Sequence, residues 1–356
     1  MDREDEIERP APAPPWATTP GSLHLMGLVA GYWSSQVVRV VSRLGLADLL
    51  AGEPRPAEEL AGAVAADPDA LSRLLRAAAA TGLVREAGRD RYALTPAGEC
   101  LLSDGRMLGD VAIGLTDPAF WRCWEHLEDA VRAGEPASGR ALGTDIWTYY
   151  RREPAEGARF AAAMNAIGAT LAASLAARYD LPPHARVVDV GGGGGLLLAE
   201  LLARSETATG VLVDRPEVLL AARELVAARG IGERVELREG DFLAELPPGG
   251  DVYVLKSVLH NWDDESAARI LANCHRAARA GSLLLVIGYV LPREPGFAHL
   301  LDLMMLVQFG GRERTEEEHR ALLSASGYTV LRVLPAVGAW GIIEARRSEE
   351  ASARAI

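Results

Sequence analysis

The chain has 356 residues, of which 49% are hydrophobic and 24% charged, a composition typical of a globular protein of about two domains. Its formal net charge of -12 and the lack of a basic patch argue against binding to nucleic acid. Its three cysteines, Cys100, Cys123 and Cys274, have no C-x-x-C spacing and indicate a reducing compartment, with neither a disulfide framework nor a zinc site.

At the N-terminus, residues 1–20 mix charges with prolines, and we expect a disordered tail. The segment is unlike a signal peptide, and no apolar run is long enough to span a membrane, so we expect a cytoplasmic protein without a membrane partner. From about Leu23 to Leu50 the pattern becomes helical, with an apolar face that includes Val37 and Val41. This face fits a domain core and a contact with a second subunit equally well.

Residues 56–102 have the pattern of a winged helix: two helices, the second at 70–80, and then a β-hairpin at 83–94. Such a module can bind DNA. Its second helix, however, offers only Arg73 and Arg76, behind two aspartates, so it would neutralise phosphates poorly. We therefore expect the winged helix to have a structural use.

The next segment, residues 106–180, is rich in aromatic side chains, and we expect a helical connector. It contains Trp147 and, on a long helix from about Ala155 to Tyr179, Phe160 and Met164. Exposed aromatic residues at this density are unusual, so they line a pocket or fill an interface. For Phe160 and Met164, plain core packing is an equally good interpretation.

From Arg186 onward strands and helices alternate, as they do in an α/β sheet. Strands are expected at residues 187–190, 210–214, 235–242, 251–256 and 282–287. The last two apolar segments, 329–333 and 340–345, are separated by too few residues for a crossover helix, so they should pair antiparallel. A parallel sheet that ends in such a hairpin differs from an ordinary dinucleotide-binding fold.

Five consecutive glycines, Gly191 to Gly195, follow the first of these strands and precede a helix. Without Cβ atoms, the loop lets a ligand pack against bare backbone near a helix N-terminus. The dinucleotide fingerprint is not met, because Leu196 stands where a third glycine is required. No G-K-[ST] sequence follows the glycines either, so a phosphate loop is not indicated.

Charged residues end the neighbouring strands, at the sheet edge where parallel sheets bind their ligands. If the ligand contains adenosine, Asp214 is placed to accept hydrogen bonds from both ribose hydroxyls, and Asp241 can accept one from the amino group of adenine. Phe242 can cover an adenine face, and Lys256 ends the fourth strand. Each aspartate could instead cap a loop or a helix.

His260 follows the fourth strand and faces the same edge. Histidine is the side chain best suited to remove a phenol proton near neutral pH. A single histidine is more often structural, but its place at a strand end favours catalysis.

The chain resembles the S-adenosylmethionine-dependent O-methyltransferase family of plant phenylpropanoid and bacterial natural-product pathways over residues 22–346. The resemblance is carried by V-V-D-V-G-G-G-x-G, V-D-R-P, G-D-F-L, L-K-S-V-L-H-N-W-D-D-E and G-G-R-E-R-T taken together. It implies a class I methyltransferase fold: an α/β, Rossmann-like sheet with a C-terminal antiparallel hairpin, preceded by a winged-helix dimerisation domain. It also implies a homodimer that transfers a methyl group, without a metal, to a hydroxyl of an aromatic or polyketide-type acceptor.

The same resemblance implies roles for individual residues. His260 would be the general base for in-line displacement, oriented by Glu313. S-adenosylmethionine, and its product S-adenosylhomocysteine, would be bound by Asp189, Gly191, Gly193, Asp214, Asp241, Phe242 and Lys256. The acceptor pocket would be lined by Trp147, Phe160, Met164, Asn261, Met305, Gln308 and Phe309.

Two positions depart from the family pattern: Asn261 replaces the usual aspartate, and Gly288 stands where a second acidic partner of the base is expected. His260 would then be held by Glu313 alone. One hypothesis is an acidic phenol as acceptor, which needs little deprotonation, so that positioning carries most of the rate. The rival is a relative that binds the same cofactor but catalyses hydroxylation, decarboxylation or rearrangement. A winged-helix regulator that senses a small molecule is the non-enzyme alternative.

These features predict five parts of the chain. They are a disordered tail (1–20), a winged-helix dimerisation domain (21–105), a helical connector that contributes to the substrate pocket (106–180), a cofactor-binding catalytic domain (181–347) and a second tail (348–356).

Overall fold

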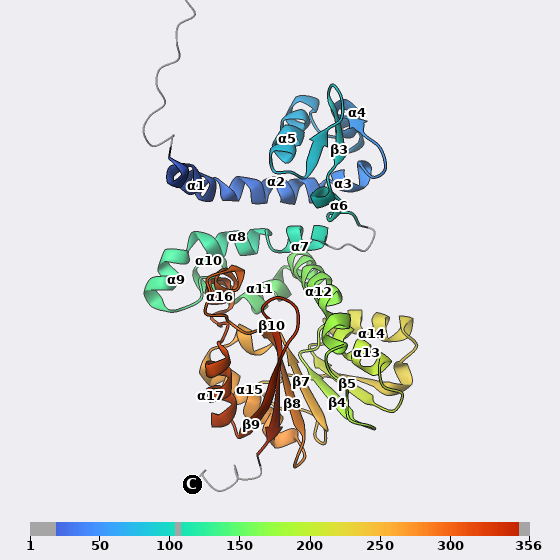
Figure 1. Cartoon of the computed structure of the whole chain (residues 1–356), viewed down its shortest axis with the longest axis vertical. Helices are drawn as coiled ribbons and strands as arrows, with labels where there is room; N and C mark the ends of the chain where they lie inside the picture. The colour runs from blue at the N-terminus through green and yellow to red at the C-terminus, as the bar shows by residue number, and fades with distance from the viewer. Residues whose placement is uncertain (1–18, 104–107, 349–356) are drawn as a thin grey trace, which may run out of the picture. The chain divides into compact units, whose positions relative to one another are not determined.

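The computed structural model of the protein describes residues 19–103 and 108–348, and the chain divides into two compact units, Met1–Thr116 and Asp117–Ile356 (Figure 1). The expected tails lie outside the described residues, apart from residues 19, 20 and 348. Residue 20 already belongs to the first helix. Within the described ranges, no helix is both long enough and apolar enough to cross a bilayer.

The first unit combines short helices with a small sheet. Its helices are α1 (Pro20–Val29), α2 (Gly31–Arg43), α3 (Leu46–Leu49), α4 (Ala57–Ala63), α5 (Pro68–Ala80), α6 (Pro96–Glu99) and α7 (Leu108–Gly114). Its strands are β1 (Arg55–Pro56), β2 (Val84–Glu86) and β3 (Arg91–Leu94), paired antiparallel in the order β1-β3-β2. Helices α4 and α5 followed by the β2–β3 hairpin form the expected winged helix. Strand β1 was not expected, because two residues are too few to give a periodic pattern.

For the apolar face expected at residues 23–50, the sequence left open a domain core and a contact with a second subunit, and different residues of the face fit each of them. Val41, on α2, packs in the core of the first unit. By contrast, Leu28 and Trp33 keep 65% and 60% of their surface exposed within one chain. Part of this face is therefore core, and part is available to a second copy.

The second unit begins with short helices and continues into a sheet flanked by helices. The helices are α8 (Pro118–Glu125), α9 (Leu127–Ala133), α10 (Ser138–Leu142), α11 (Ile146–Arg152), α12 (Pro154–Ala176), α13 (Leu196–Ala203), α14 (Leu219–Ala228), α15 (Asp264–Ala277), α16 (Phe297–Phe309) and α17 (Glu316–Ala325). The strands are β4 (Arg186–Val190), β5 (Thr209–Asp214), β6 (Val235–Glu239), β7 (Val252–Lys256), β8 (Leu283–Tyr289), β9 (Tyr328–Pro335) and β10 (Trp340–Arg347).

The seven strands form one sheet in the order β6-β5-β4-β7-β8-β10-β9. The first five pair parallel, whereas β10 runs antiparallel to both β8 and β9. The chain thus ends in the antiparallel hairpin that the sequence predicts. The strand order reverses between β4 and β7, and the carboxyl ends of strands beside such a switch point are where open α/β sheets bind ligands.

The central strands of the sheet are buried on both faces, because helices cover each face (Figure 1). Side chains alternate along β4, so that Val187 packs with helices α12, α13 and α14 on one face and Val188 packs with α15 and α17 on the other. The β-branched strands therefore form the centre of two cores, and this rigid sheet holds the loops at its carboxyl edge.

Candidate active site

The glycine loop between β4 and α13 adopts backbone conformations that require glycine. Gly191, Gly193 and Gly195 have φ angles of 67°, 60° and 79°, a region that costs a residue with a Cβ roughly 1 kcal/mol or more. Space is also tight, because a Cβ on Gly192 would lie 2.6 Å from Oδ2 of Asp189. A Cβ on Gly194 would lie 2.9 Å from Oδ1 of Asn165 on α12. The loop is therefore fixed by its neighbours rather than being a flexible linker.

Asp214, the last residue of β5, is joined to this loop by its carboxylate. Oδ2 accepts a hydrogen bond from the amide of Gly193 at 2.9 Å, and Oδ1 accepts one from the amide of Arg215 at 2.8 Å. Burial raises the pKa of Asp214, and these two amides oppose that rise. Each carboxylate oxygen has a further lone pair, so the group can still accept hydrogen bonds from a ligand.

Asp189 lies beneath the glycine loop and is only 1% exposed. Neither of its carboxylate oxygens has a hydrogen-bond partner among the residues that the structure describes. Burial raises the pKa of Asp189 to about 7, and the charge of Lys256 opposes the rise. Burial lowers the pKa of Lys256, opposed by Asp189. A buried acceptor without a partner is costly, so a ligand that donates hydrogen bonds here would relieve that cost.

Asp241 and Phe242 follow β6 and have different environments. Asp241 is exposed, and its Oδ1 accepts a hydrogen bond from the amide of Leu243 at 2.9 Å, so it caps its own turn. The ring of Phe242 packs edge-to-face on Trp262 at 6.1 Å. A Cβ on Gly191 would lie 3.3 Å from the Phe242 ring, which places this ring beside the glycine loop. The expected cofactor residues thus gather at one edge of the sheet.

His260 and Glu313 form a close pair, although they are 53 positions apart in the chain. The Nδ1 atom of His260 lies 2.7 Å from Oε1 of Glu313. The glutamate is 2% exposed, while the histidine side chain is 18% exposed. With Nδ1 engaged by a carboxylate, Nε2 is the nitrogen that can take up a proton.

A buried arginine that the sequence analysis did not single out holds this pair together. Arg314 is 1% exposed, and its guanidinium bonds to the carbonyls of Leu259 and Trp262, on both sides of His260. It also bonds to Oδ1 of Asp264 at 2.7 Å and 3.0 Å. Five donors in a rigid fork suit such a role. The signal was present, since Arg314 lies in the same G-G-R-E-R-T motif as Glu313.

The turn from β7 to His260 contains two further constraints. Ser257 has a φ of 55°, an unusual conformation for a residue other than glycine. Asn261, expected in the acceptor pocket, donates a hydrogen bond from Nδ2 to the carbonyl of Ser257 at 3.1 Å. The side-chain amide of Asn261 thus closes the turn by bonding to its first residue, Ser257.

Three of the expected acceptor-pocket residues meet in one aromatic cluster, which we define as Phe120, Trp147, Tyr150, Phe160 and Phe309. Phe160 lies at its centre, with ring centroids 4.9 to 6.3 Å from the other four. The rings come from α8, α11, α12 and α16. Arg215, next to Asp214, lies 5.6 Å over the ring of Trp147. The aromatic cluster therefore adjoins the cofactor edge.

The other expected pocket residues have less distinctive surroundings. Met305 is buried on α16, and Met164 is half-buried on α12. Gln308 is fully buried, and its Nε2 donates a hydrogen bond to the carbonyl of Phe120 at 3.1 Å. This bond joins α16 to α8, the helix that carries Phe120 of the aromatic cluster.

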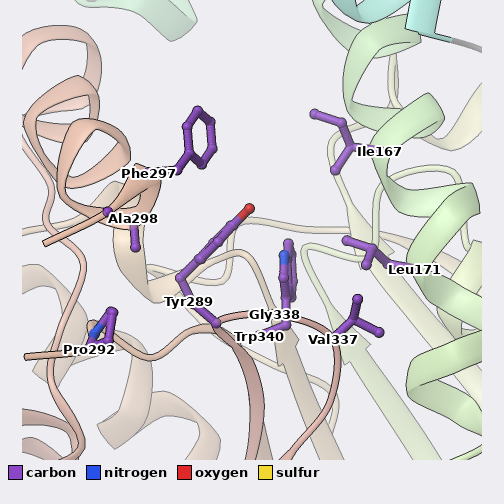
Figure 2. Close-up of a pocket in the computed structure, with 11 residues that line it drawn as sticks. Ile167, Leu171, Tyr289, Pro292, Phe297, Ala298, Val337, Gly338 and Trp340 are labelled. Atoms are coloured by element: carbon purple, nitrogen blue, oxygen red, sulfur yellow. The ribbon is translucent and has the colours of Figure 1, made fainter. Parts of the chain in front are cut away.

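A cavity of about 530 Å³, which no sequence motif indicated, opens between α12, α16 and the ends of β8 and β10 (Figure 2). Tyr289 and Trp340 project from the ends of β8 and β10, with their ring centroids 4.9 Å apart. They stand between Phe297 and Ala298 on α16 and Ile167 and Leu171 on α12 (Figure 2). The volume is in the range of sites for small organic ligands.

The strand order, the glycine loop and the acidic strand end at the switch point together define a class I S-adenosylmethionine-dependent methyltransferase fold. The residues present fit the cofactor: a carboxylate at a strand end suits a ribose diol, and the partnerless oxygens of Asp189 can accept hydrogen bonds from a donor. Within the described part of the chain, no group of three or more His, Cys, Asp and Glu side chains is arranged to hold a metal ion.

Comparison with known proteins gives the family. An O-methyltransferase domain model matches residues 124–329, and an O-methyltransferase dimerisation domain model matches residues 26–104. O-demethylpuromycin-O-methyltransferase of Streptomyces alboniger is 39% identical over 90% of this chain and 88% of its own. The chain therefore belongs to the O-methyltransferase family, and it is an S-adenosylmethionine-dependent enzyme.

Solved structures of related proteins support the same family. The mitomycin 7-O-methyltransferase MmcR is 38% identical, with a TM-score of 0.89 over 93% of this chain and 99% of its own. The neocarzinostatin biosynthesis O-methyltransferase NcsB1, solved with S-adenosylmethionine and 2-hydroxy-5-methyl naphthoic acid, is 35% identical, with a TM-score of 0.76 over 87% and 95% of the two chains. These relatives are methyltransferases, and they give the rival hypothesis of non-methyl chemistry no support.

Proposed function

We propose that this methyltransferase acts on a phenolic hydroxyl of an aromatic or polyketide-type small molecule in natural-product biosynthesis, with His260 as general base. The observation that carries the proposal is the 2.7 Å pair of His260 and Glu313 beside the cofactor edge. The relatives support the same class of acceptor: they include an O-demethylpuromycin O-methyltransferase, a mitomycin 7-O-methyltransferase and an enzyme of neocarzinostatin biosynthesis solved with a hydroxynaphthoic acid.

The residues divide the work of an in-line displacement. S-adenosylmethionine supplies an electrophilic methyl group when it is bound. His260 keeps its proton on Nδ1, donated to Glu313, so that its Nε2 lone pair takes the proton of the acceptor hydroxyl. Glu313 fixes the ring and stabilises the imidazolium that results. Most of the remaining rate comes from holding acceptor and donor in line.

For the cofactor, Asp214 would accept hydrogen bonds from the ribose hydroxyls, and Asp241 would accept one from the adenine amino group. Phe242 would cover an adenine face. The glycine loop, with Gly191 and Gly193, would lie against the methionine portion. Asp189 and Lys256 would face the charged end of that portion. The support is the gathering of these residues at one sheet edge.

The acceptor would lie between the base and the aromatic cluster, against Trp147, Phe160, Met164, Asn261, Met305, Gln308 and Phe309. The apolar cavity beside Tyr289 gives it room to extend. A flat, hydrophobic molecule matches these walls, because ring faces gain from stacking on one another.

We also propose a homodimer formed through the first unit. Its support is the match to the dimerisation domain model and the exposed apolar side chains of α1 and α2, such as Leu28 and Trp33. The free thiols of Cys100, Cys123 and Cys274 support a reducing, cytoplasmic setting.

The test is transfer of a labelled methyl group from S-adenosylmethionine to a panel of hydroxynaphthoates, hydroxyphenazines and hydroxyquinones, with the matching arylamines as controls. Label in the phenols and not in the amines is the expected result. Label in the amines alone would contradict the hydroxyl as acceptor atom, and turnover without label would contradict methyl transfer.

A further inference from the structure

The strongest unassigned feature is a small cavity behind the catalytic pair, at the place where Gly288 ends the buried part of β8. The cavity has a volume of about 20 Å³ and is lined by Ser257, His260, Gly288, Glu313 and His319, among others. A Cβ built on Gly288 would meet no atom within 4 Å. A volume of this size holds one water molecule if it has polar partners.

His319, on α17, is the polar group of this cavity that no role yet explains. The side chain is 7% exposed, and Tyr289 lines the same cavity. The Nδ1 atom is buried and has no hydrogen-bond partner in the part of the chain that the structure describes.

The protonation state of His319 follows from its surroundings. Burial lowers its pKa to about 4, helped by the positive charge of Arg314 and opposed by Glu318. The ring is thus neutral near pH 7, with a proton on one of its two nitrogens. In the tautomer with the proton on Nε2, the buried Nδ1 is an acceptor that needs a donor.

We propose that His319 is a positioning residue for the base: through one water molecule in the Gly288 cavity, it anchors the Glu313 carboxylate that holds His260. The water donates one hydrogen to Nδ1 of His319 and the other to Glu313, so that both acceptors are satisfied. Glu313 then has a fixed position from which to accept the Nδ1 proton of His260 at 2.7 Å. His319 and Gly288 together supply an anchor that a second carboxylate at position 288 would otherwise supply.

This inference rests on the proposed function, in which His260 is the base, and the experiment separates the two. The informative pair is His319→Asn and His319→Leu, which are nearly equal in shape and both remove the imidazole ring. Only asparagine keeps an acceptor near the position of Nδ1. We expect His319→Leu to lower kcat about tenfold, the fold-change for one hydrogen bond, and His319→Asn to stay near the parent.

Filling the cavity tests the water directly. Gly288→Ala has room for its methyl group and excludes the water, so it should also lower kcat about tenfold. Because both changes break one bridge, the double variant Gly288→Ala/His319→Leu should be no slower than the slower single variant. Gly62→Ala in the first unit, another glycine with open space at its Cβ, is the matched control.

Equal kcat for the asparagine and leucine variants, or losses that multiply in the double variant, would overturn the inference. If His319→Leu does not fold, a parental kcat for Gly288→Ala overturns it alone. His260→Ala tests the underlying function. Normal turnover of that variant would contradict the role of His260 as general base. A large loss in His260→Ala, together with equal kcat for the two His319 variants, would contradict only the role of His319.

Discussion

Two parts of the second unit are built in different ways: the cofactor edge, which comprises the glycine loop and the strand ends at Asp214, Asp241 and Lys256, and the acceptor wall, which is the aromatic cluster. The cofactor edge uses short segments that each directly follow a strand, and its closest contacts are made by backbone, as in the bond from the Gly193 amide to Asp214. The acceptor wall uses side chains from four helices, and its centre, Phe160, contacts rings as far away in sequence as Phe309. Backbone contacts do not depend on side-chain identity, so the cofactor edge keeps its shape and its ligand. Side chains of the aromatic cluster can be substituted with little effect on the fold, so the acceptor that they contact can vary.

Removal of the base should give the largest effect and should be confined to the acceptor side. We expect His260→Ala to lower kcat by about 10²–10⁴-fold, the usual contribution of a general base, while the affinity for S-adenosylhomocysteine stays unchanged. Steady-state kinetics and calorimetry measure the two quantities. His275→Ala, at a histidine on α15, is the control. Near-normal turnover would mean that positioning alone suffices.

The converse change is on the cofactor edge. Asp214→Ala should weaken cofactor binding by about 10–100-fold, because hydrogen bonds to a charged group contribute about 1.5–3 kcal/mol each. The KM for the acceptor at saturating cofactor should change little. Glu217→Ala, an acid three residues further along, is the matched control. Equal cofactor affinity in calorimetry would remove Asp214 from the site.

The buried carboxyl of Asp189 predicts a pH dependence that belongs to the cofactor edge alone. Its pKa is raised to about 7, so the folded chain keeps a proton that the unfolded chain loses near pH 4. The free energy of unfolding therefore falls as pH rises through this window. Asp189→Asn should flatten the fall by on the order of 2 kcal/mol between pH 5 and 8.

Urea unfolding of the free enzyme at several pH values measures this slope. The exposed Asp180, changed to asparagine, should leave the slope as it is in the parent. A parental slope in the Asp189→Asn protein would be evidence against a protonated carboxyl beneath the glycine loop.

The smallest effect is expected in the acceptor wall. Phe160→Leu removes the central ring of the aromatic cluster and should raise the acceptor KM about three- to tenfold, since an aromatic pair contributes about 0.5–1.5 kcal/mol. Cofactor affinity should not change. Leu220→Ala, at an exposed position of α14, is the control. If Phe160→Leu weakened cofactor binding as much as it raised the acceptor KM, the aromatic cluster and the cofactor edge would not act independently.

This division also explains what the sequence could predict. Most strands of the large sheet were located within two residues, because β-branched runs such as Val187–Val190 bury both faces and leave a continuous apolar pattern. The strand expected at residues 235–242 was predicted three residues too long, since β6 ends at Glu239. The glycine loop and the terminal hairpin were likewise readable from adjacent residues. The family assignment followed from motifs of the same local kind.

What could not be predicted depends on contacts between distant segments. The bounds of α8 to α11 are not marked by periodicity, because helices of five to eight residues contain barely two turns. The cavity beside Tyr289 and Trp340 is formed by four separate elements. The burial of Arg314 and of His319 likewise exists only after α17 has docked on the sheet.

The loop that carries His260 is locked to the segment before Glu313 by backbone alone. The amide of Arg312 donates to the carbonyl of His260 at 2.9 Å, and a Cβ on Gly311 would collide with that same carbonyl. There is no room for even a methyl group at this crossing, so the reach of the imidazole is set by the main chain. Engineers who wish to retarget the enzyme would therefore do best to leave residues 310–314 untouched and to vary the ring-bearing helices instead.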